Sequence, residues 1–510
     1  MLQLLRRTFT IDLRALALMR ISIGFLLLAD LLTRLPDLAT FYTHEGNFPL
    51  RYLTSAHYTS KHLFAYRWLD SPWGAGCLFA LAGLAALCLV LGVRSRLSMA
   101  VSWFLLASLH SRNTYVLDMG DVYLRIVMLW CIFLPMGARY SLEARRHPDW
   151  VQLPNRFFSL AAAGYILQVS VVYGVAGILK SDPLWTTRGD ALFYALSIDQ
   201  FSTQFAQKLL NYPTFLRPFN FLALWAELLA PLLICAPVAT TRFRLFAVAI
   251  LTALHLGIAS CLHLGLLVPI CIALLIGLWP AELLDWLEPR LPKFMRPVLE
   301  GPSSRSGHAL PNNYQPNKTR SLFATSLIVY IVVQNALVIP QLNIKPYALI
   351  VTPVANYGRF FAVLQNWQLF APYPFPDDGW FILEGNRQDG VIVDLLRQGQ
   401  PVSYYKPALV SAQFKNQRWR RFYQNLWRRS NPLHIPNYCN WEMNRWNRVH
   451  PDGHRLTKVR FIFVQEFTQP PGVPLTLKSY VMGEYPSPAV NINASTLEEC
   501  HCQDQLHHEH

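Results

Sequence analysis

The sequence is poor in charged residues and in cysteine. Only 15% of its 510 residues are charged, and nine are cysteine. A typical soluble globular protein carries roughly 25% charged residues. Because 53% of the residues are hydrophobic, the composition excludes a disordered chain and does not fit an ordinary soluble enzyme. The sparse cysteines exclude a small scaffold held together by disulfides.

Acidic residues are also scarce, with 30 Asp and Glu against 45 Lys and Arg, which gives a net charge of +15. Such an excess is compatible with nucleic-acid binding. In a chain this apolar, basic loops on the cytoplasmic side of a membrane explain it better. We therefore expect membrane lipids as partners and no nucleic acid.

Long apolar runs recur along the chain. A helix needs roughly 20 apolar residues to cross a bilayer, and the sequence predicts an all-α polytopic membrane bundle of about nine such helices. The first run resembles a signal peptide, but Arg20 and Asp30 interrupt it, so we expect it to be retained. The candidate spans lie at about 11–33, 74–93, 97–111, 122–137, 157–179, 218–238, 243–261, 264–284 and 321–343, and the third and fourth are short.

The distribution of Lys and Arg between these spans predicts the orientation. With the N-terminus in the cytoplasm, the inner segments hold 17 Lys and Arg and the outer segments hold 10. The positive-inside rule favours this arrangement. We expect an integral protein of a bacterial inner or plasma membrane, with its C-terminal domain outside the cell or in the periplasm.

Composition divides the chain into five parts. A helical transmembrane domain is predicted at 1–284, a cytoplasmic linker at 285–320 and a last span at 321–343. Residues 344–490 read as an extramembrane α+β domain, with strands near Trp380 and Phe461 and a helix over 411–429. Residues 491–510 form a polar tail with Cys and His, in which no standard set of metal ligands is complete.

Ionisable residues are costly within spans, so each is a candidate functional group. Arg20 and Asp30 share roughly one helix face, and pairing with other helices is the favoured interpretation. The loop after 97–111 carries Arg112, Asn113 and Asp121. Either an Arg112–Asp121 ion pair closes this loop, or the loop binds an anion or a polar headgroup.

Lys180 follows twenty nearly uncharged residues that include Tyr173. A lysine at a helix end often only reaches toward the membrane interface. In apolar surroundings a lysine can instead serve as a base near neutral pH, and Trp185 comes soon enough to cover such a site. His255 lies within a span, near the face of His263. A hydrogen bond to another helix is its more common role, and no metal is predicted.

Short motifs add to these residues in a fixed order along nearly the whole chain. The motifs are Ile11-Asp12-Leu13-Arg14 through Arg20; Phe41-Tyr42 with Gly46; Arg112-Asn113 with Gly120-Asp121; Leu134-Pro135 with Ser141-Leu142; Tyr173 to Lys180 with Trp185; His255 with Gly265-Leu266; and Trp367 to Pro374, followed by Asp378-Gly379-Trp380. With this order and spacing, the chain resembles the HTTM family, the membrane proteins related to vitamin K-dependent γ-glutamyl carboxylase.

The resemblance implies a reaction. The carboxylases use reduced vitamin K, a naphthohydroquinone, with O2 and CO2 to convert Glu side chains of exported proteins to γ-carboxyglutamate. The family's buried catalytic lysine follows an aromatic-x-x-Ala-Gly segment and precedes a tryptophan, a pattern that Lys180 matches. By the same resemblance, we expect the other candidates to bind the quinone or the substrate: Arg112, Asn113, Asp121, Tyr173, Trp185 and His255.

The chain also departs from the animal enzymes. They carry Asn-His-Ser-Tyr where this sequence reads Arg112-Asn113-Thr114-Tyr115. The alternative function is a non-catalytic membrane protein with a binding or assembly role. A transporter is a third class, which would predict repeated halves with interrupted helices. The sequence shows no such internal symmetry.

Overall fold

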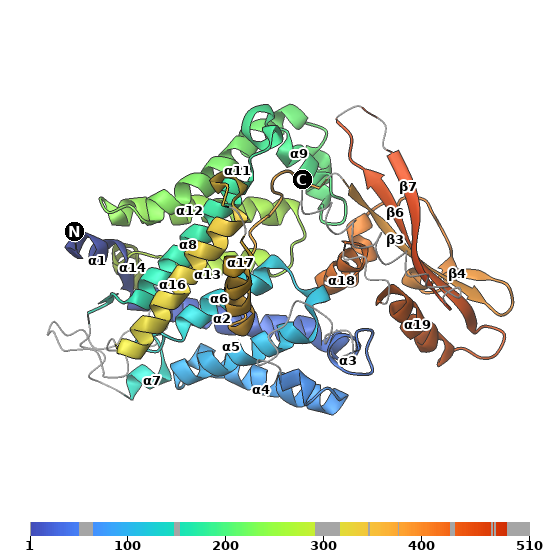
Figure 1. Ribbon diagram of the computed structural model, residues 1–510, viewed down its shortest axis with the longest axis horizontal. Helices are drawn as coiled ribbons and strands as arrows, with labels where there is room; N and C mark the ends of the chain where they lie inside the picture. Colours follow the sequence, from blue (N-terminus) through green and yellow to red (C-terminus); the bar gives the residue numbers. More distant parts are fainter. Residues whose placement is uncertain are drawn as a thin grey trace. The chain divides into compact units, whose positions relative to one another are not determined.

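A computed structural model describes residues 2–49, 65–146, 154–290, 317–344, 347–375, 377–428, 434–470, 473 and 476–486. Most of these residues are helical (Figure 1). Within the described ranges they form two compact units: one of the residues up to 380 with 406–425 and 465–477, the other of 381–405, 426–464 and 478–486. The principal helices are α1 (Leu2–Thr8), α2 (Leu13–Arg34), α3 (Leu38–Tyr42), α4 (Pro72–Leu91), α5 (Ser95–Arg112), α6 (Met119–Cys131), α7 (Leu142–Arg145), α8 (Leu160–Leu179), α9 (Ala191–Leu196), α10 (Gln204–Leu209), α11 (Pro213–Ile234), α12 (Thr240–Cys261), α13 (Leu267–Ile276), α14 (Ala281–Leu287), α16 (Lys318–Val338), α17 (Ala348–Phe360), α18 (Gln417–Arg428) and α19 (His434–Asn447).

Six helical segments among the described residues are long and apolar enough to cross a membrane. They are the run Leu13–Tyr42, which begins with α2, and the helices α4, α8, α11, α12 and α16. The predicted span 264–284 is two helices, α13 and α14, bent by 96° at the break between them, and this pair gives a seventh span if it crosses as one. The predicted runs 97–111 and 122–137 fold as α5 and α6. At 13 residues, α6 is shorter than the roughly 20 that a bilayer requires.

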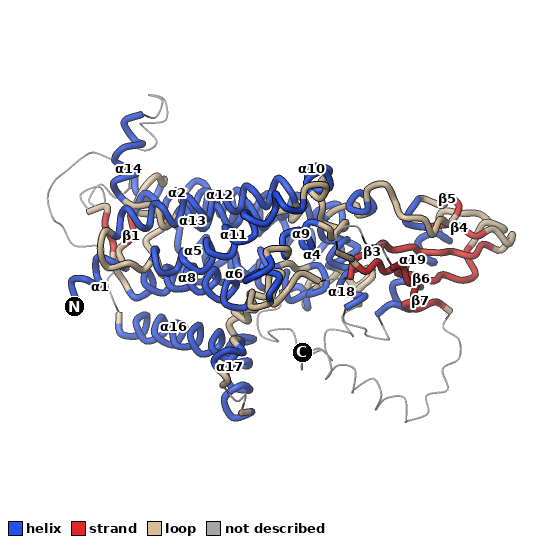
Figure 2. Tube along the Cα trace, turned by 90° about the horizontal axis from the view of Figure 1, so that it is seen from above, coloured by secondary structure: helices blue, strands red, loops and turns tan. Residues whose placement is uncertain are grey.

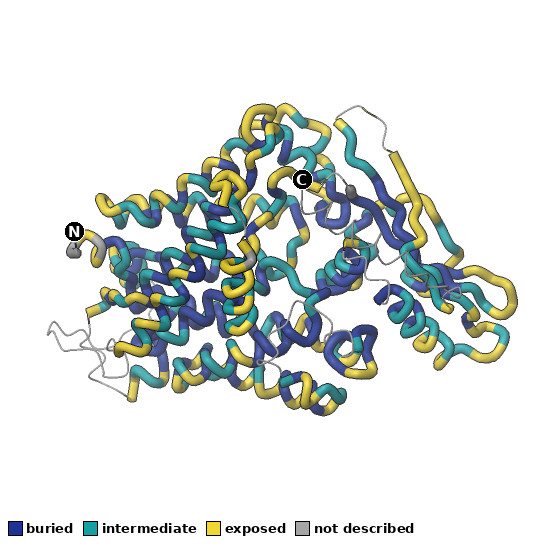
Figure 3. The backbone as a smooth tube through the Cα atoms, in the orientation of Figure 1, coloured by how far each residue is buried: buried dark blue, intermediate teal, exposed yellow. Residues whose placement is uncertain are grey.

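The packing of the first unit separates inner helices from outer ones. In the most apolar window of α8, 72% of the residues are buried, against 28% in α11, α12 and α16. The outer helices keep large apolar side chains exposed, among them Leu232 on α11 and Phe246 on α12, and Figure 3 shows exposed positions along both. Exposed apolar faces on long helices are what a lipid environment favours. α8 is therefore a central helix of the bundle.

The second unit contains most of a five-stranded sheet with the order β5-β4-β3-β6-β7, drawn in red in Figure 2. β3 and β4 are antiparallel, with Glu384 opposite Asp394, and Phe381 stacks on Phe461 between β3 and β6. The predicted strands near Trp380 and Phe461 are thus confirmed. The bounds are β3 (Asp377–Arg387), β4 (Ile392–Asp394), β5 (Gln400–Pro401), β6 (Leu456–Phe467) and β7 (Thr476–Tyr485), and β1 (Ile11–Asp12) pairs with β2 (Arg156–Phe157) in the first unit.

The two units do not divide at the predicted boundary of residue 344. Residues 344–380 belong to the first unit, and so do residues 406–425, which contain most of α18. A helix was predicted at 411–429, but its place in the first unit depends on contacts with distant residues. Residues 291–316 of the predicted linker and the tail at 491–510 lie outside the described residues. α14 and α16 occupy the two ends of the predicted linker range.

Candidate functional site

Lys180 caps the C-terminal end of α8. The helix ends at Leu179, and Lys180 leaves the helical conformation with ψ at 59°. Its side chain is only 5% exposed, and its Nζ lies 2.5 Å from Glu227 Oε2 on α11. The same Nζ lies 5.4 Å from the centre of the Trp185 ring. The lysine is therefore buried between an aromatic ring and one carboxylate.

Two glycines of α8 allow α11 to come close enough for this contact. A Cβ at Gly177 would lie 2.9 Å from Leu228 Cδ2 and 3.2 Å from the backbone N of Leu228, and a Cβ at Gly174 would touch Pro231. Because these positions carry no side chain, the backbones of α8 and α11 approach closely, and Glu227 faces Lys180. The sequence reasoning missed Glu227. As the one acidic residue of α11, it was open to the rule that marks ionisable groups in spans.

Trp185 is held in place on both sides. Its indole Nε1 donates to the carbonyl of Phe370 at 2.9 Å. Its own carbonyl accepts from Asn220 Nδ2 at 3.0 Å. The ring is 3% exposed, so it covers Lys180 as a fixed group, as the sequence predicted.

Tyr173 and His255 form a second buried pair. The Tyr173 hydroxyl and His255 Nε2 are 2.8 Å apart. Tyr173 precedes Lys180 by two helical turns, about 10 Å along the axis of α8. His263, by contrast, is exposed because α12 ends at Cys261 and Leu262 is extended. The expectation that His255 and His263 share a face is therefore wrong, whereas the interhelical hydrogen bond of His255 is present.

Arg112 and Asn113 bind backbone carbonyls of α3 and of the segment that follows it. Arg112 donates to Thr43 O at 2.6 Å and to Phe48 O at 2.8 Å. Asn113 Nδ2 lies 3.3 Å from Phe41 O. All of these groups are buried. Arg112 does not pair with Asp121, so the ion pair considered from the sequence is replaced by hydrogen bonds that fasten another loop.

Asp121 belongs instead to a buried network with Asp30, Arg34 and Arg418. The Arg34 guanidinium binds two carboxylates: it lies 2.7 Å from Asp30 Oδ2 and 2.9 Å from Asp121 Oδ1. Arg418 on α18 donates to Asp30 at 2.8 Å and to both carboxylate oxygens of Asp121. Two carboxylates and two guanidinium groups thus compensate each other in the interior. Arg20 takes no part with Asp30 here and donates to the Tyr140 carbonyl.

Ligand atoms of Asp30, His110 and Asp121 lie within 4.8 Å of one another, as in a metal site. Arg34 and Arg418 already supply the positive charge at both carboxylates. The donor set therefore fits two guanidinium groups better than a cation, and we assign no metal to it.

A further acidic cluster contains Asp199, Asp378 and Glu466, and Lys406 pairs with two of these residues. Lys406 Nζ lies 2.5 Å from Asp199 and 2.7 Å from Glu466. Asp378 accepts a hydrogen bond from the Asp199 backbone N–H, while its other oxygen is buried without a partner in the described structure. Burial, together with the neighbouring Asp199 charge, raises the pKa of Asp378 to about 8.

The predicted site residues therefore form several local groups. Lys180 is with Trp185, Tyr173 with His255, and Arg112 with Asn113, whereas Asp121 lies in the Arg418 network. In comparisons with known proteins, no family model, curated protein or solved structure matches the chain. The fold by itself defines a mostly helical protein whose long apolar helices suit a membrane.

Proposed function

We propose that this chain is an HTTM-type integral membrane enzyme related to the vitamin K-dependent carboxylases, of the carbon–carbon lyase class, with Lys180 as the general base. The supporting observation is the burial of Lys180 against Trp185, with Glu227 as its ion-pair partner in the described structure. We also propose the finer topology: about nine spans, a cytoplasmic N-terminus, and a C-terminal domain outside a bacterial membrane.

The Lys180–Glu227 pair suits proton transfer. An ammonium–carboxylate pair and an amine–carboxylic acid pair carry the same net charge. Passing the proton between the two groups therefore changes no net charge in the interior. Glu227 Oε2 lies within hydrogen-bond distance of Nζ and is placed to receive that proton, so that Nζ can accept a proton from a hydroxyl placed beside it.

The residues around Lys180 fit a lipid-soluble aromatic hydroxyl compound. Trp185 offers a fixed aromatic surface, and the apolar side chain of Leu228 lies on the neighbouring turn of α11 beside Gly177. When bound, a reduced naphthoquinone would supply, with O2, the strong base that a glutamate γ-carbon requires before CO2 can add. Lys180 would accept the proton of the hydroquinone hydroxyl, and Trp185 would exclude water. Arg112 and Asn113 would act through the loop that they fasten.

The alternative is a non-catalytic membrane protein with a binding or assembly role. The Lys180–Glu227 ion pair is also compatible with a non-catalytic role, because an ion pair between α8 and α11 can serve solely to join two helices. Activity measurements on purified protein therefore decide between them.

The experiment uses the full-length protein in lipid nanodiscs with reduced vitamin K, labelled CO2 and a Glu-containing peptide. Hydroquinone-dependent O2 consumption and label incorporation are measured for the wild type, Lys180→Arg, Lys180→Ala and the exposed control Lys208→Arg. Lys180→Arg should lose roughly 100-fold or more, the usual contribution of a general base, because an arginine stays protonated. Small amines should partly rescue Lys180→Ala. Full activity in Lys180→Arg would reject Lys180 as the base, and an inactive wild type would favour the non-catalytic role.

A further inference from the structure

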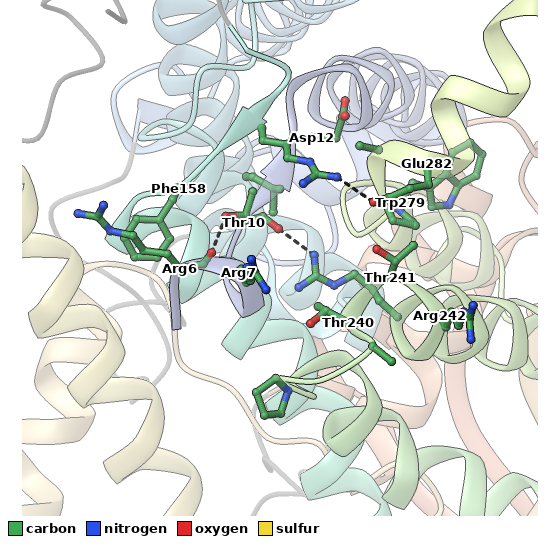
Figure 4. Close-up of a pocket in the computed structure, with 17 residues that line it drawn as sticks. Arg6, Arg7, Thr10, Asp12, Phe158, Thr240, Thr241, Arg242, Trp279 and Glu282 are labelled. Carbon is green, nitrogen blue, oxygen red and sulfur yellow. Dashed lines mark hydrogen bonds and ion pairs between the residues drawn. The ribbon is translucent and has the colours of Figure 1, made fainter. Parts of the chain in front are cut away.

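A cavity of about 710 Å³ opens where α1, β1, α12 and α14 meet (Figure 4). Five arginines line it, against the two acidic residues Asp12 and Glu282. It adjoins the start of α8, since Phe158 lines it and α8 begins at Leu160. α8 has 20 residues and rises 1.5 Å per residue, so the cavity is about 30 Å along the helix from Lys180. It is thus a separate site, independent of the proposed function.

Each of the two carboxylates of the cavity has an arginine partner. Asp12 pairs at 3.0 Å with Arg14, which lies outside the lining and also binds Asp285 and Glu288. Glu282 pairs with Arg156 at 2.8 Å. In the part of the chain that the structure describes, the other four lining arginines have no ion-pair partner: Arg6, Arg7, Arg242 and Arg244. The cavity therefore carries an uncompensated positive charge.

Arg244 contributes a buried positive charge to the cavity. Its side chain is 4% exposed, although its guanidinium contacts only uncharged groups. Nη1 donates to Thr10 O at 2.8 Å, Nη2 donates to Thr8 O, and the buried Nε has no partner among the described atoms. A buried charge without a counter-charge is costly. An anion in the cavity would offset that cost.

Backbone groups add to this potential. α12 begins at Thr240, after Ala239, whose side chain supplies no cap. The N–H groups of the first turn, from Thr240 to Arg242, lack acceptors within the helix. The N-terminus of a long helix attracts anions, phosphate in particular. Thr240 and Thr241 of this turn line the cavity (Figure 4).

The position of the cavity favours a lipid. α2, α8 and α12 all begin beside it, at Leu13, Leu160 and Thr240, so it lies at one end of three candidate spans. The aromatic residues Phe158 and Trp279 also line it, and aromatic rings are common at the level of lipid headgroups. Basic pockets at span ends bind phosphate-bearing headgroups.

We propose that this cavity binds a phosphate group, supplied by the headgroup of an anionic phospholipid. The exposed Arg7 and Arg242 contact its oxygens together with the first turn of α12, and Arg244 supplies the buried charge. A soluble phosphate compound offers the same phosphate oxygens, so the experiment below distinguishes a lipid headgroup from a soluble compound.

The test compares binding of short-chain phosphatidylglycerol, short-chain phosphatidylcholine and inorganic phosphate to the purified full-length protein by native mass spectrometry and thermal shift. Arg7→Gln/Arg242→Gln removes two exposed charges from the cavity. Arg145→Gln/Arg146→Gln removes two exposed charges outside the lining. Phosphatidylglycerol should bind the cavity variant about 25-fold more weakly, or about fivefold for each arginine, and should bind the control as it binds the wild type.

Each outcome decides the proposal. The selective loss of phosphatidylglycerol binding supports the headgroup site. If inorganic phosphate binds alone, with the same loss in the cavity variant, the phosphate site stands and its source is a soluble compound. Equal binding to both double variants, or binding of phosphatidylcholine as tight as that of phosphatidylglycerol, overturns the proposal. Melting of each variant without ligand reports whether it folds.

Discussion

Lys180 on α8 and Glu227 on α11 form an ion pair at 2.5 Å although 47 residues separate them in the sequence. Replacing one partner leaves a charge without compensation in the interior, which costs about 3–5 kcal/mol, whereas replacing both with apolar groups is often close to neutral. We expect Lys180→Met and Glu227→Leu each to lower the melting temperature, and the double variant to recover most of the loss. Breaking the exposed Arg217–Asp190 pair should cost at most about 1 kcal/mol. If the double variant is the least stable of the three, the two groups are not coupled as the structure indicates.

Gly177 sets the distance between the same two helices. Gly177→Ala should push α11 away and lower stability, because its Cβ would meet backbone as well as side-chain atoms of Leu228. Gly257→Ala on α12 meets nothing within 4 Å and should stabilise the protein by about 0.5–1 kcal/mol. Thermal unfolding of the two variants checks this. A Gly177→Ala protein as stable as Gly257→Ala would contradict the close approach of α8 and α11.

Arg112 and Asp121 bind different partners, so their substitutions should add. Asp121→Ala should destabilise strongly, since Arg34 and Arg418 both lose a carboxylate. Arg112→Ala should loosen the segment from Thr43 to Phe48, and the double variant should lose about the sum of the two effects. Arg418→Ala combined with Asp121→Ala should instead lose less than the sum. A double-variant cycle measured by chemical unfolding distinguishes these results, and strong coupling between Arg112 and Asp121 would contradict the structure.

Asp378 should make stability depend on pH. Burial and the Asp199 charge raise its pKa in the folded protein to about 8, from an ordinary value of 3.8. Because the pKa is raised in the folded state, the contribution of Asp378 to the free energy of unfolding is fully present below pH 3.8. That contribution is lost as the pH rises toward 8. Asp378→Asn should remove that loss, so its melting temperature should gain on the wild type between pH 4 and pH 8. The exposed Asp452 provides the control, Asp452→Asn. A constant difference between Asp378→Asn and the wild type across this range would rule out the titration.

The proposed topology places Lys318 in the cytoplasm and the C-terminal domain outside. Trp380 is 1% exposed, whereas Tyr405 is 90% exposed, so Tyr405→Cys is the better reporter for the outer side and Lys318→Cys for the inner side. An impermeant thiol reagent should label Tyr405→Cys in intact cells and Lys318→Cys only after lysis. Unsubstituted protein gives the background, because Cys77 is exposed. The reverse pattern would invert the topology.

The sequence by itself determined the local features of this protein. Apolar runs predicted the long helices, short stretches rich in aromatic and β-branched residues predicted the strands β3 and β6, and the change from apolar to polar residues located Lys180 at the end of α8. These properties are sums over neighbouring residues, so a single sequence suffices to read them.

Only the tertiary structure decided the partners. Glu227 faces Lys180 because two glycines bring α11 close, and Arg418 reaches Asp121 across 297 residues of sequence. The second contact also places most of α18 in the first unit rather than in the C-terminal domain to which its sequence position assigned it. Hydropathy records how much each residue avoids water. It does not record which distant group will meet a buried charge, because that depends on how the helices pack.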